Sequence, residues 1–130
     1  MTAQTAVRSR VTTGGGEIVK STGDGILARF DSPSRAVRAG LALCGAAQRQ
    51  EIQLRVAIHT GEVEVRADDL GGIGVHIASR VLAEAGPSEV LVTRTVRDLA
   101  TGTDVDLRAR GTTSLRGVPG EWELFEASLR

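Results

Sequence analysis

The chain has 130 residues, with 16 basic and 16 acidic side chains and no net charge; 41% of its residues are hydrophobic. This length fits one domain, and the balance is that of a globular protein rather than a disordered one. Neutral charge argues against nucleic acid as a partner, and no apolar run approaches the ~20 residues that cross a bilayer. The single cysteine, Cys44, excludes an internal disulfide and a cysteine-based zinc site. We therefore expect one cytoplasmic domain that binds neither nucleic acid nor a membrane.

The first half of the chain predicts a hairpin followed by a helix. Residues 1–16 are polar and show no period, so we expect them to form an arm outside the domain. Strands are predicted at 17–21 and 26–30, because a Gly-Asp-Gly turn separates two short apolar runs. Ser32 and Pro33 then predict the start of a helix that reaches about residue 50.

The second half alternates strands with helices. Residues 53–59 and 62–66 both alternate apolar with polar side chains, which predicts a second hairpin. The remaining expected elements are a turn at 67–72, a helix at 73–84, a strand at 89–92, a short helix at 93–99, a strand at 105–107, a turn at 115–120 and a strand at 122–125. The predicted class is α+β, with a mostly antiparallel sheet and helices on one face. The predicted domain covers residues 17–130.

One candidate site is the turn at residues 20–25, KSTGDG. Asp24 would lie at the rim of a sheet, where a carboxylate can bind a hard cation such as Mg²⁺. Aspartate is also common in hairpin turns for conformational reasons alone, and this cluster by itself favours that interpretation. Lys20 is the single lysine of the chain. Either the site requires an ammonium group there, or the single lysine is due to chance; the two explanations are equally good.

Further candidates surround the predicted helix at 73–84. Asp69 precedes the glycines that open this helix, where it could cap the helix or contribute to a binding site. His76 and Arg80 are four residues apart and therefore share one helical face. They could hold a sugar and a phosphate, or they could be ordinary residues at the edge of an apolar stripe. His59 has no nucleophile motif to serve, and we interpret it as structural.

In combination and in this order, these segments resemble the catalytic domain of class III adenylate/guanylate cyclases of the bacterial branch. The segments that carry the resemblance are EIVKSTGDG, RVAIHTG, DLGGIGVHIASR, GPSEVLV and LRGVPG, between residues 17 and 120. The resemblance implies a ferredoxin-like fold and a head-to-tail homodimer with active sites between the subunits. It also implies conversion of ATP or GTP to the 3′,5′-cyclic monophosphate and pyrophosphate.

The resemblance assigns a role to each candidate residue. It implies that Asp24 binds metal (Mg²⁺ or Mn²⁺) and that Lys20 and Asp69 read the purine, in the combination that selects adenine. It implies that Arg80 stabilises charge on the α-phosphate. His76 lies where most members have an asparagine that orients the ribose, and an imidazole can still donate one hydrogen bond.

The N-terminus departs from the family pattern. Members open with a strand that carries a second metal-binding aspartate, whereas residues 1–16 contain no acidic residue. We therefore expect a truncated cyclase fold without its first strand, an incomplete metal site and little or no turnover. One alternative is an active adenylate cyclase, in which Asp24 holds the metal with water and nucleotide oxygens or a partner chain supplies the missing aspartate. The other is a non-catalytic nucleotide-binding or dimerisation/regulatory module of cyclase fold.

Overall fold

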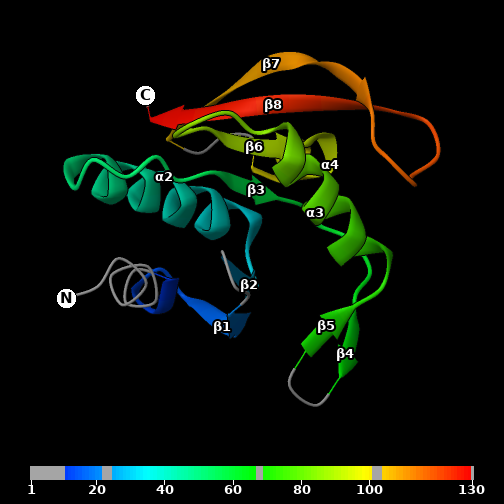
Figure 1. The fold of residues 1–130 in the computed structure, drawn as a ribbon, viewed down its shortest axis with the longest axis horizontal. Coiled ribbons are helices and arrows are strands. Elements are labelled where there is room, and N and C mark those ends of the chain that lie inside the picture. The colour runs from blue at the N-terminus through cyan, green and yellow to red at the C-terminus, as the bar shows by residue number, and fades with distance from the viewer. Residues whose placement is uncertain (1–10, 22–24, 67–68, 101–103, 130) are drawn as a thin grey trace.

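The protein consists of a four-stranded sheet, helices that pack on it, and two separate strand pairs (Figure 1). The computed structural model describes residues 11–21, 25–66, 69–100 and 104–129. The strands are β1 (Gly16–Ser21), β2 (Ile26–Phe30), β3 (Val56–Ile58), β4 (Glu64–Arg66), β5 (Asp69–Gly71), β6 (Val90–Thr93), β7 (Val105–Ser114) and β8 (Glu121–Leu129). The helices labelled in Figure 1 are α2 (Pro33–Arg49), α3 (Ile73–Glu84) and α4 (Arg94–Ala100).

The main sheet has the strand order β3-β6-β8-β7. β3 and β6 are parallel, whereas β8 is antiparallel to both β6 and β7. β1 and β2 form one antiparallel pair, and β4 and β5 form another. The expected α+β class and cyclase-like fold are confirmed.

Local signals position α2 on the sheet. The Ser32 side chain accepts a hydrogen bond of 3.3 Å from the backbone N–H of Arg35, and Pro33 occupies the first helical turn. Farther along the helix, a Cβ atom at Gly40 would lie 3.1 Å from Cγ1 of Val56. The absence of a side chain at Gly40 therefore allows α2 to approach β3 closely, which favours glycine there despite its cost in a helix.

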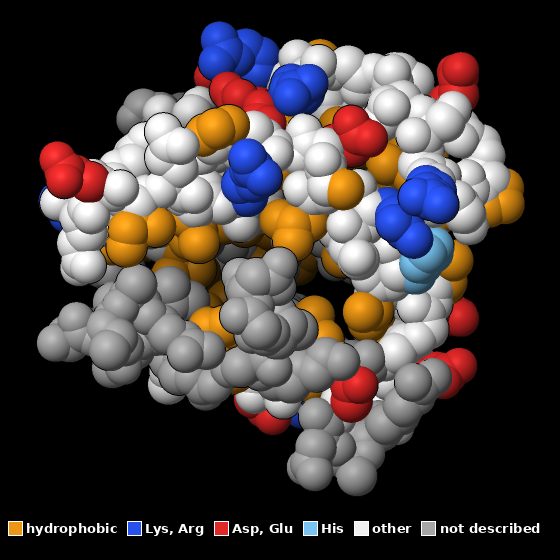
Figure 2. All heavy atoms as spheres, viewed as in Figure 1, with side chains coloured by type: hydrophobic (Ala, Val, Ile, Leu, Met, Phe, Trp, Pro, Cys, Tyr) orange, Lys and Arg blue, Asp and Glu red, His pale blue; other side chains and the backbone are white. Residues whose placement is uncertain are grey.

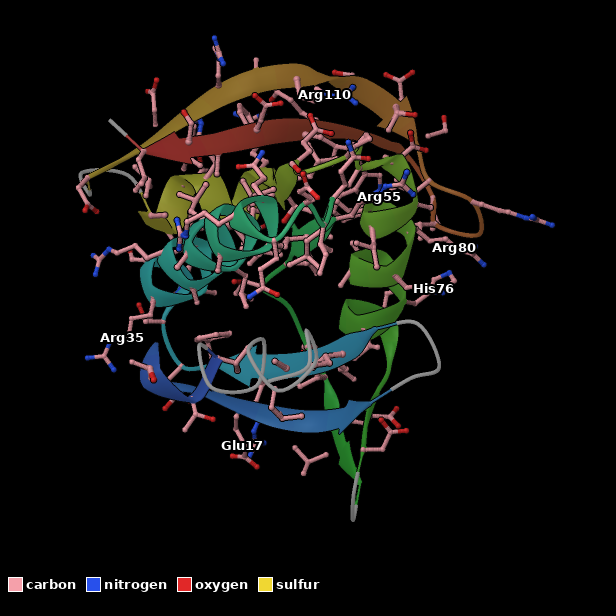
Figure 3. The ribbon with its side chains drawn as sticks, turned by 60° about the vertical axis from the view of Figure 1, so that its left-hand side comes forward. Glu17, Arg35, Arg55, His76, Arg80 and Arg110 are labelled. Carbon is pink, nitrogen blue, oxygen red and sulfur yellow. The ribbon has the colours of Figure 1, made fainter. Side chains whose placement is uncertain are left out.

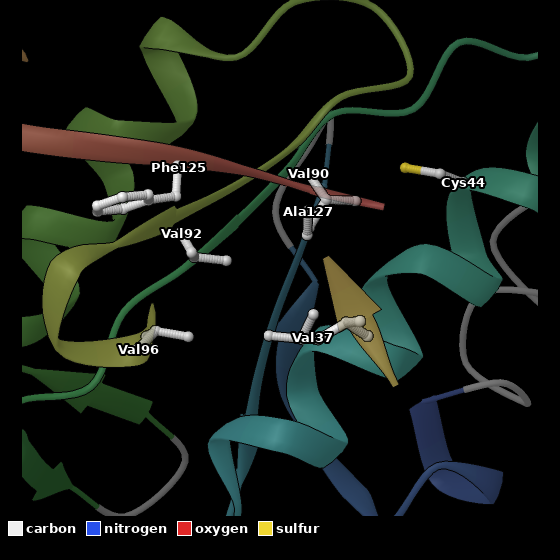
Figure 4. Close-up of a cluster of buried hydrophobic side chains, with 8 residues drawn as sticks. Val37, Cys44, Val90, Val92, Val96, Phe125 and Ala127 are labelled. Atoms are coloured by element: carbon white, nitrogen blue, oxygen red, sulfur yellow. The ribbon is translucent and has the colours of Figure 1, made fainter. Parts of the chain in front are cut away.

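Two hydrophobic clusters occupy opposite faces of the main sheet. In the first, Val37 of α2 and Val96 of α4 pack on Val92 of β6 and Phe125 of β8 (Figure 4). The second cluster consists of Ile77, Val81, Ala85, Leu91, Leu115 and Leu124, with α3 supplying the first two. Successive residues of a strand point to opposite faces, so Leu91 and Val92 belong to different clusters. The helices are thus shared between both faces rather than gathered on one.

The second predicted hairpin is wrong. β4 pairs with β5, in the segment expected to be a turn, while β3 pairs in parallel with β6 about thirty residues away. The alternation of apolar and polar residues in 53–66 correctly predicted strands. It did not predict which other strand each of them pairs with. The strand expected at 105–107 is also longer, because β7 continues to Ser114 through a register shift between Ala109 and Gly111.

The hairpin of β1 and β2 and the extent of α3 are confirmed. Residues 11–13 of the expected arm are helical, and Val11 is only 3% exposed. Among the described helices, none is both long and apolar enough to cross a membrane.

Candidate functional site

The predicted site residues on α3 lie on one side of that helix. Gly74, Ile77 and Val81 are buried, and His76 and Arg80 lie beside this stripe, half-buried, and project away from the helix (Figure 3). Figure 2 shows basic side chains beside a histidine at the end of the molecule where α3 lies. This end of the protein therefore presents an imidazole and a guanidinium to solvent, as a phosphate-containing ligand would require.

Arg80 has an unusual environment for an arginine. Its Nε atom is removed from solvent and has no hydrogen-bond partner, and no other buried side-chain N or O atom in the described segments lacks one. A buried polar atom without a partner costs about 1–3 kcal/mol. A bound anion or a partner subunit that supplies an acceptor would remove this cost.

The start of α3 is fixed by close backbone packing. Gly72 has φ = 91°, a conformation that favours glycine, and it precedes the helix directly. The N–H of Gly74 donates a 3.0 Å hydrogen bond to the carbonyl of Glu62. A Cβ at Gly74 would lie 2.5 Å from that same oxygen. The first turn of α3 can therefore dock on the segment before β4 only because residue 74 has no side chain.

We expect Gly74→Ala to destabilise the protein by about 1–3 kcal/mol, because the new methyl group must displace either the helix or the 62–63 backbone. Gly45→Ala is the matched control: its Cβ would meet only Arg49 Nη1, at 3.7 Å, within α2. Alanine in that helix should stabilise by about 0.5–1 kcal/mol. Urea unfolding measures both, and equal effects of the two substitutions would contradict this account of Gly74.

The purine-reading pair expected from the resemblance comes from two neighbouring strands. Asp69 begins β5, pairs in register with Arg66 of β4 and is half-buried. β5 contacts both α3 and β1, and β1 carries Lys20 next to a register shift. The backbone thus brings Lys20, Asp69 and the start of α3 to one region. The candidate metal ligand, Asp24, lies outside the described residues.

The loop between β7 and β8 also belongs to this region, which the sequence interpretation missed. Gly117 has φ = 77°, and a Cβ there would lie 3.2 Å from Nε2 of His76. The indole N–H of Trp122 donates a 3.3 Å hydrogen bond to the carbonyl of Pro119. The LRGVPG motif was a signal for this loop, but only the tertiary structure shows that it packs against His76.

A separate cavity of about 550 Å³ lies between α2 and the ends of β6 and β8. Glu89 and Arg110 line it, and none of the predicted site residues does. Burial opposes ionisation of Glu89, but hydrogen bonds from Arg110 (2.9 Å) and from the Gly86 N–H (2.8 Å) lower its pKa to about 2. We interpret this cluster as one that fixes the 86–89 loop to β7.

Comparisons with known proteins agree with this geometry. The family described as "Adenylate and Guanylate cyclase catalytic domain" matches residues 10–126. The chain is 37% identical over 100 residues to "Putative adenylate cyclase 3" of Rhizobium meliloti (70% of this chain, 17% of that protein). It is 30% identical over 121 residues to "Adenylate cyclase" of Glutamicibacter nicotianae (91% of this chain, 30% of that protein).

Solved structures show the same fold. An adenylate/guanylate cyclase/hydrolase from Silicibacter pomeroyi superposes with a TM-score of 0.85 at 28% identity, covering 95% of this chain and 82% of that one. A Trypanosoma brucei adenylate cyclase gives 0.88 at 21% identity, covering 98% and 76%. The chain belongs to the family of adenylate and guanylate cyclase catalytic domains. It spans less than a third of the length of the two curated relatives described above.

Proposed function

We propose that this chain is an adenylate cyclase-type domain that binds ATP, or GTP more weakly, on the surface formed by α3, β5 and β1. The observation that carries the proposal is Arg80, whose Nε is buried without an acceptor beside His76 on the outer side of α3. A nucleotide triphosphate supplies the acceptors that this guanidinium lacks. We place the domain at residues 17–130 and in the cytoplasm, where ATP is available.

In this proposal each residue of the site has one task. Lys20 and Asp69 hydrogen-bond the adenine edge, and His76 donates to the ribose. Arg80 stabilises the charge that develops on the α-phosphate as the 3′-oxygen attacks it. A bond forms between that oxygen and the α-phosphorus while the bond to pyrophosphate breaks, and the 3′-hydroxyl proton is released.

Mg²⁺ or Mn²⁺ bound at Asp24 would lower the pKa of the 3′-hydroxyl and neutralise pyrophosphate. A pair of such ions needs more than one carboxylate, and no acidic residue precedes Glu17 in these 130 residues. Among the described residues, no group of three His, Cys, Asp or Glu side chains could hold a metal. We propose that residues 1–130 by themselves bind the metal weakly through Asp24 and turn over little or no substrate.

We further propose that the domain forms a homodimer. An exposed apolar patch, defined by Val63, Val65 and Ile73, lies on the β4 arm and the start of α3, with exposed fractions of 45%, 73% and 52%. Val63 directly precedes β4, and its Cγ1 lies 3.2 Å from the position of a Cβ on Gly74, the residue after Ile73. Large exposed apolar patches mark interaction sites. This patch also favours the second candidate function, a non-catalytic dimerisation module.

ATP titration followed by a cyclic AMP assay tests the proposal. We expect ATP to bind at micromolar to millimolar concentrations in Mg²⁺ or Mn²⁺, more tightly than GTP, with little cyclic AMP formed. Asp24→Ala should abolish any product, whereas Asp104→Ala, on the distant loop that pairs with Arg38, should not. No ATP binding at millimolar concentration would contradict the proposal and leave the dimerisation module. Efficient turnover would show instead that the metal site is complete.

A further inference from the structure

His59 lies behind the proposed nucleotide surface, at the end of β3. Its Nδ1 is 2.8 Å from the hydroxyl oxygen of Thr93, the last residue of β6. Thr93 is 0% exposed, and its side chain is polar, whereas the other buried side chains of the described core are hydrophobic. The hydrogen bond therefore satisfies a hydroxyl that has no access to water, and it ties the ends of two parallel strands together.

The same imidazole contacts the segment that carries α3. Nε2 of His59 lies 2.9 Å from the position of a Cβ on Gly61, and that position is 3.8 Å from Cα of Gly74. Glu62, the next residue, accepts the hydrogen bond from the Gly74 N–H. A change in the His59 ring would therefore be felt at the first turn of α3, two residues before His76.

On another side, His59 contacts the anchor of the 115–120 loop. Its ring meets the Trp122 ring edge-on, with centroids 5.8 Å apart and an interplanar angle of 77°. Trp122 in turn holds Pro119 through the indole hydrogen bond, and Gly117 of that loop packs on His76. His59 thus contacts the segment that leads into α3, which carries His76, and through Trp122 it also supports the loop that packs on His76.

We propose that His59 is a positioning residue for the nucleotide site: its ring, held by Thr93, sets the start of α3 and the 115–120 loop against each other beside His76. The inference rests on the proposed function for its effect on ATP. It replaces the interpretation of His59 as merely structural, because the groups it orients are those that would contact ligand.

The environment of the ring favours the neutral form. Burial lowers the pKa of His59 from its usual value of 6.5. The charged side chains nearest in sequence to its contacts are two exposed carboxylates, Glu62 and Glu121, and an ion pair of Arg94 and Glu123, whose charged atoms lie 3.6 Å apart. The unfolded chain therefore takes up a proton first as the pH falls below 6.5. The stability that the neutral ring contributes is complete above that pH and is lost below it.

Tryptophan fluorescence gives a direct test, because Trp122 is the single tryptophan and the chain has no tyrosine. We expect its emission to change as His59 titrates, with a midpoint below pH 6.5, and ATP affinity to fall with the same midpoint. His59→Asn keeps an amide that can bond Thr93 but cannot titrate in this range. It should retain ATP affinity within about twofold and lose the pH dependence of both signals.

His59→Ala should weaken ATP binding about tenfold at pH 7.5. The reason is that it leaves the buried Thr93 hydroxyl without its partner, and the free-energy cost of such a loss corresponds to about a tenfold change in affinity. His76→Gln, which removes the other histidine, should leave the fluorescence transition in place. An ATP affinity unchanged in His59→Ala, or equally low in His59→Asn, would overturn the positioning role. If the wild-type protein binds no ATP, the proposed function fails. If the wild-type protein shows no change in tryptophan fluorescence with pH, the proposed contact of a titrating His59 with Trp122 is refuted, whether or not ATP binds.

Discussion

Replacing Arg80 with alanine is expected to weaken ATP binding at least tenfold and to lower any cyclase turnover by about 10²–10³-fold. The reason is that Arg80 is the described side chain whose buried nitrogen lacks an acceptor, on the surface where the phosphates are proposed to lie. Arg80→Lys keeps the charge but loses the planar, two-pronged donor geometry, so it should restore affinity only in part. Isothermal titration with ATP measures the affinity of each variant.

Arg38→Ala provides the control for this experiment. Arg38 lies on α2, away from α3, and its Nε pairs with Asp104 at 3.1 Å on the surface. Exposed pairs of this kind contribute little to stability, so ATP affinity should be unchanged. Equal affinity of Arg80→Ala and wild type for ATP would contradict the assignment of Arg80 to the phosphate site.

Replacing Val65 with aspartate is expected to weaken self-association about tenfold or more. Val65 is the most exposed side chain of the patch formed with Val63 and Ile73, at 73%. A carboxylate at the centre of an apolar contact must lose its hydration without gaining a partner. The family resemblance implies that Asp24 of one subunit faces Lys20, Asp69 and Arg80 of the other, and we propose the same arrangement here. ATP binding in the presence of metal should therefore weaken together with dimerisation.

Leu99→Asp is the matched control for this substitution. Leu99 is also an exposed apolar residue, at 58%, but it lies on α4 against the other face of the sheet. Light scattering from micromolar to submillimolar concentration should show dimers for wild type and Leu99→Asp, and monomers for Val65→Asp. A wild type that stays monomeric throughout would contradict the proposed homodimer.

The elements predicted correctly from the sequence are those fixed by neighbours in the chain. The hairpin of β1 and β2 follows from a short turn, and α2 begins where Ser32 caps it. α3 runs from Ile73 to Glu84 as its apolar spacing and the following glycine and proline predict. Each of these signals acts over a few residues, so no knowledge of distant contacts is needed.

The elements predicted wrongly depend on distant contacts. Residues 62–66 could pair with either flanking segment; β4 pairs with β5, while β3 pairs in parallel with β6. Two parallel strands must be joined by a long crossover connection, so they lie far apart in the chain. A local sequence pattern therefore cannot predict that they pair. The helices cover both faces for a related reason: β6 is buried on both sides, and an apolar run does not say which helix covers which side.

The candidate site divides in the same way. The sequence by itself determined the membership in a cyclase family and the spacing of His76 and Arg80, because both depend on the order of residues along the chain and on helical periodicity. Only the tertiary structure decided that Lys20 and Asp69 lie on touching strands, and that His59 contacts both Gly61 and Trp122. These contacts join residues far apart in the chain, and packing rather than local propensity brings them together.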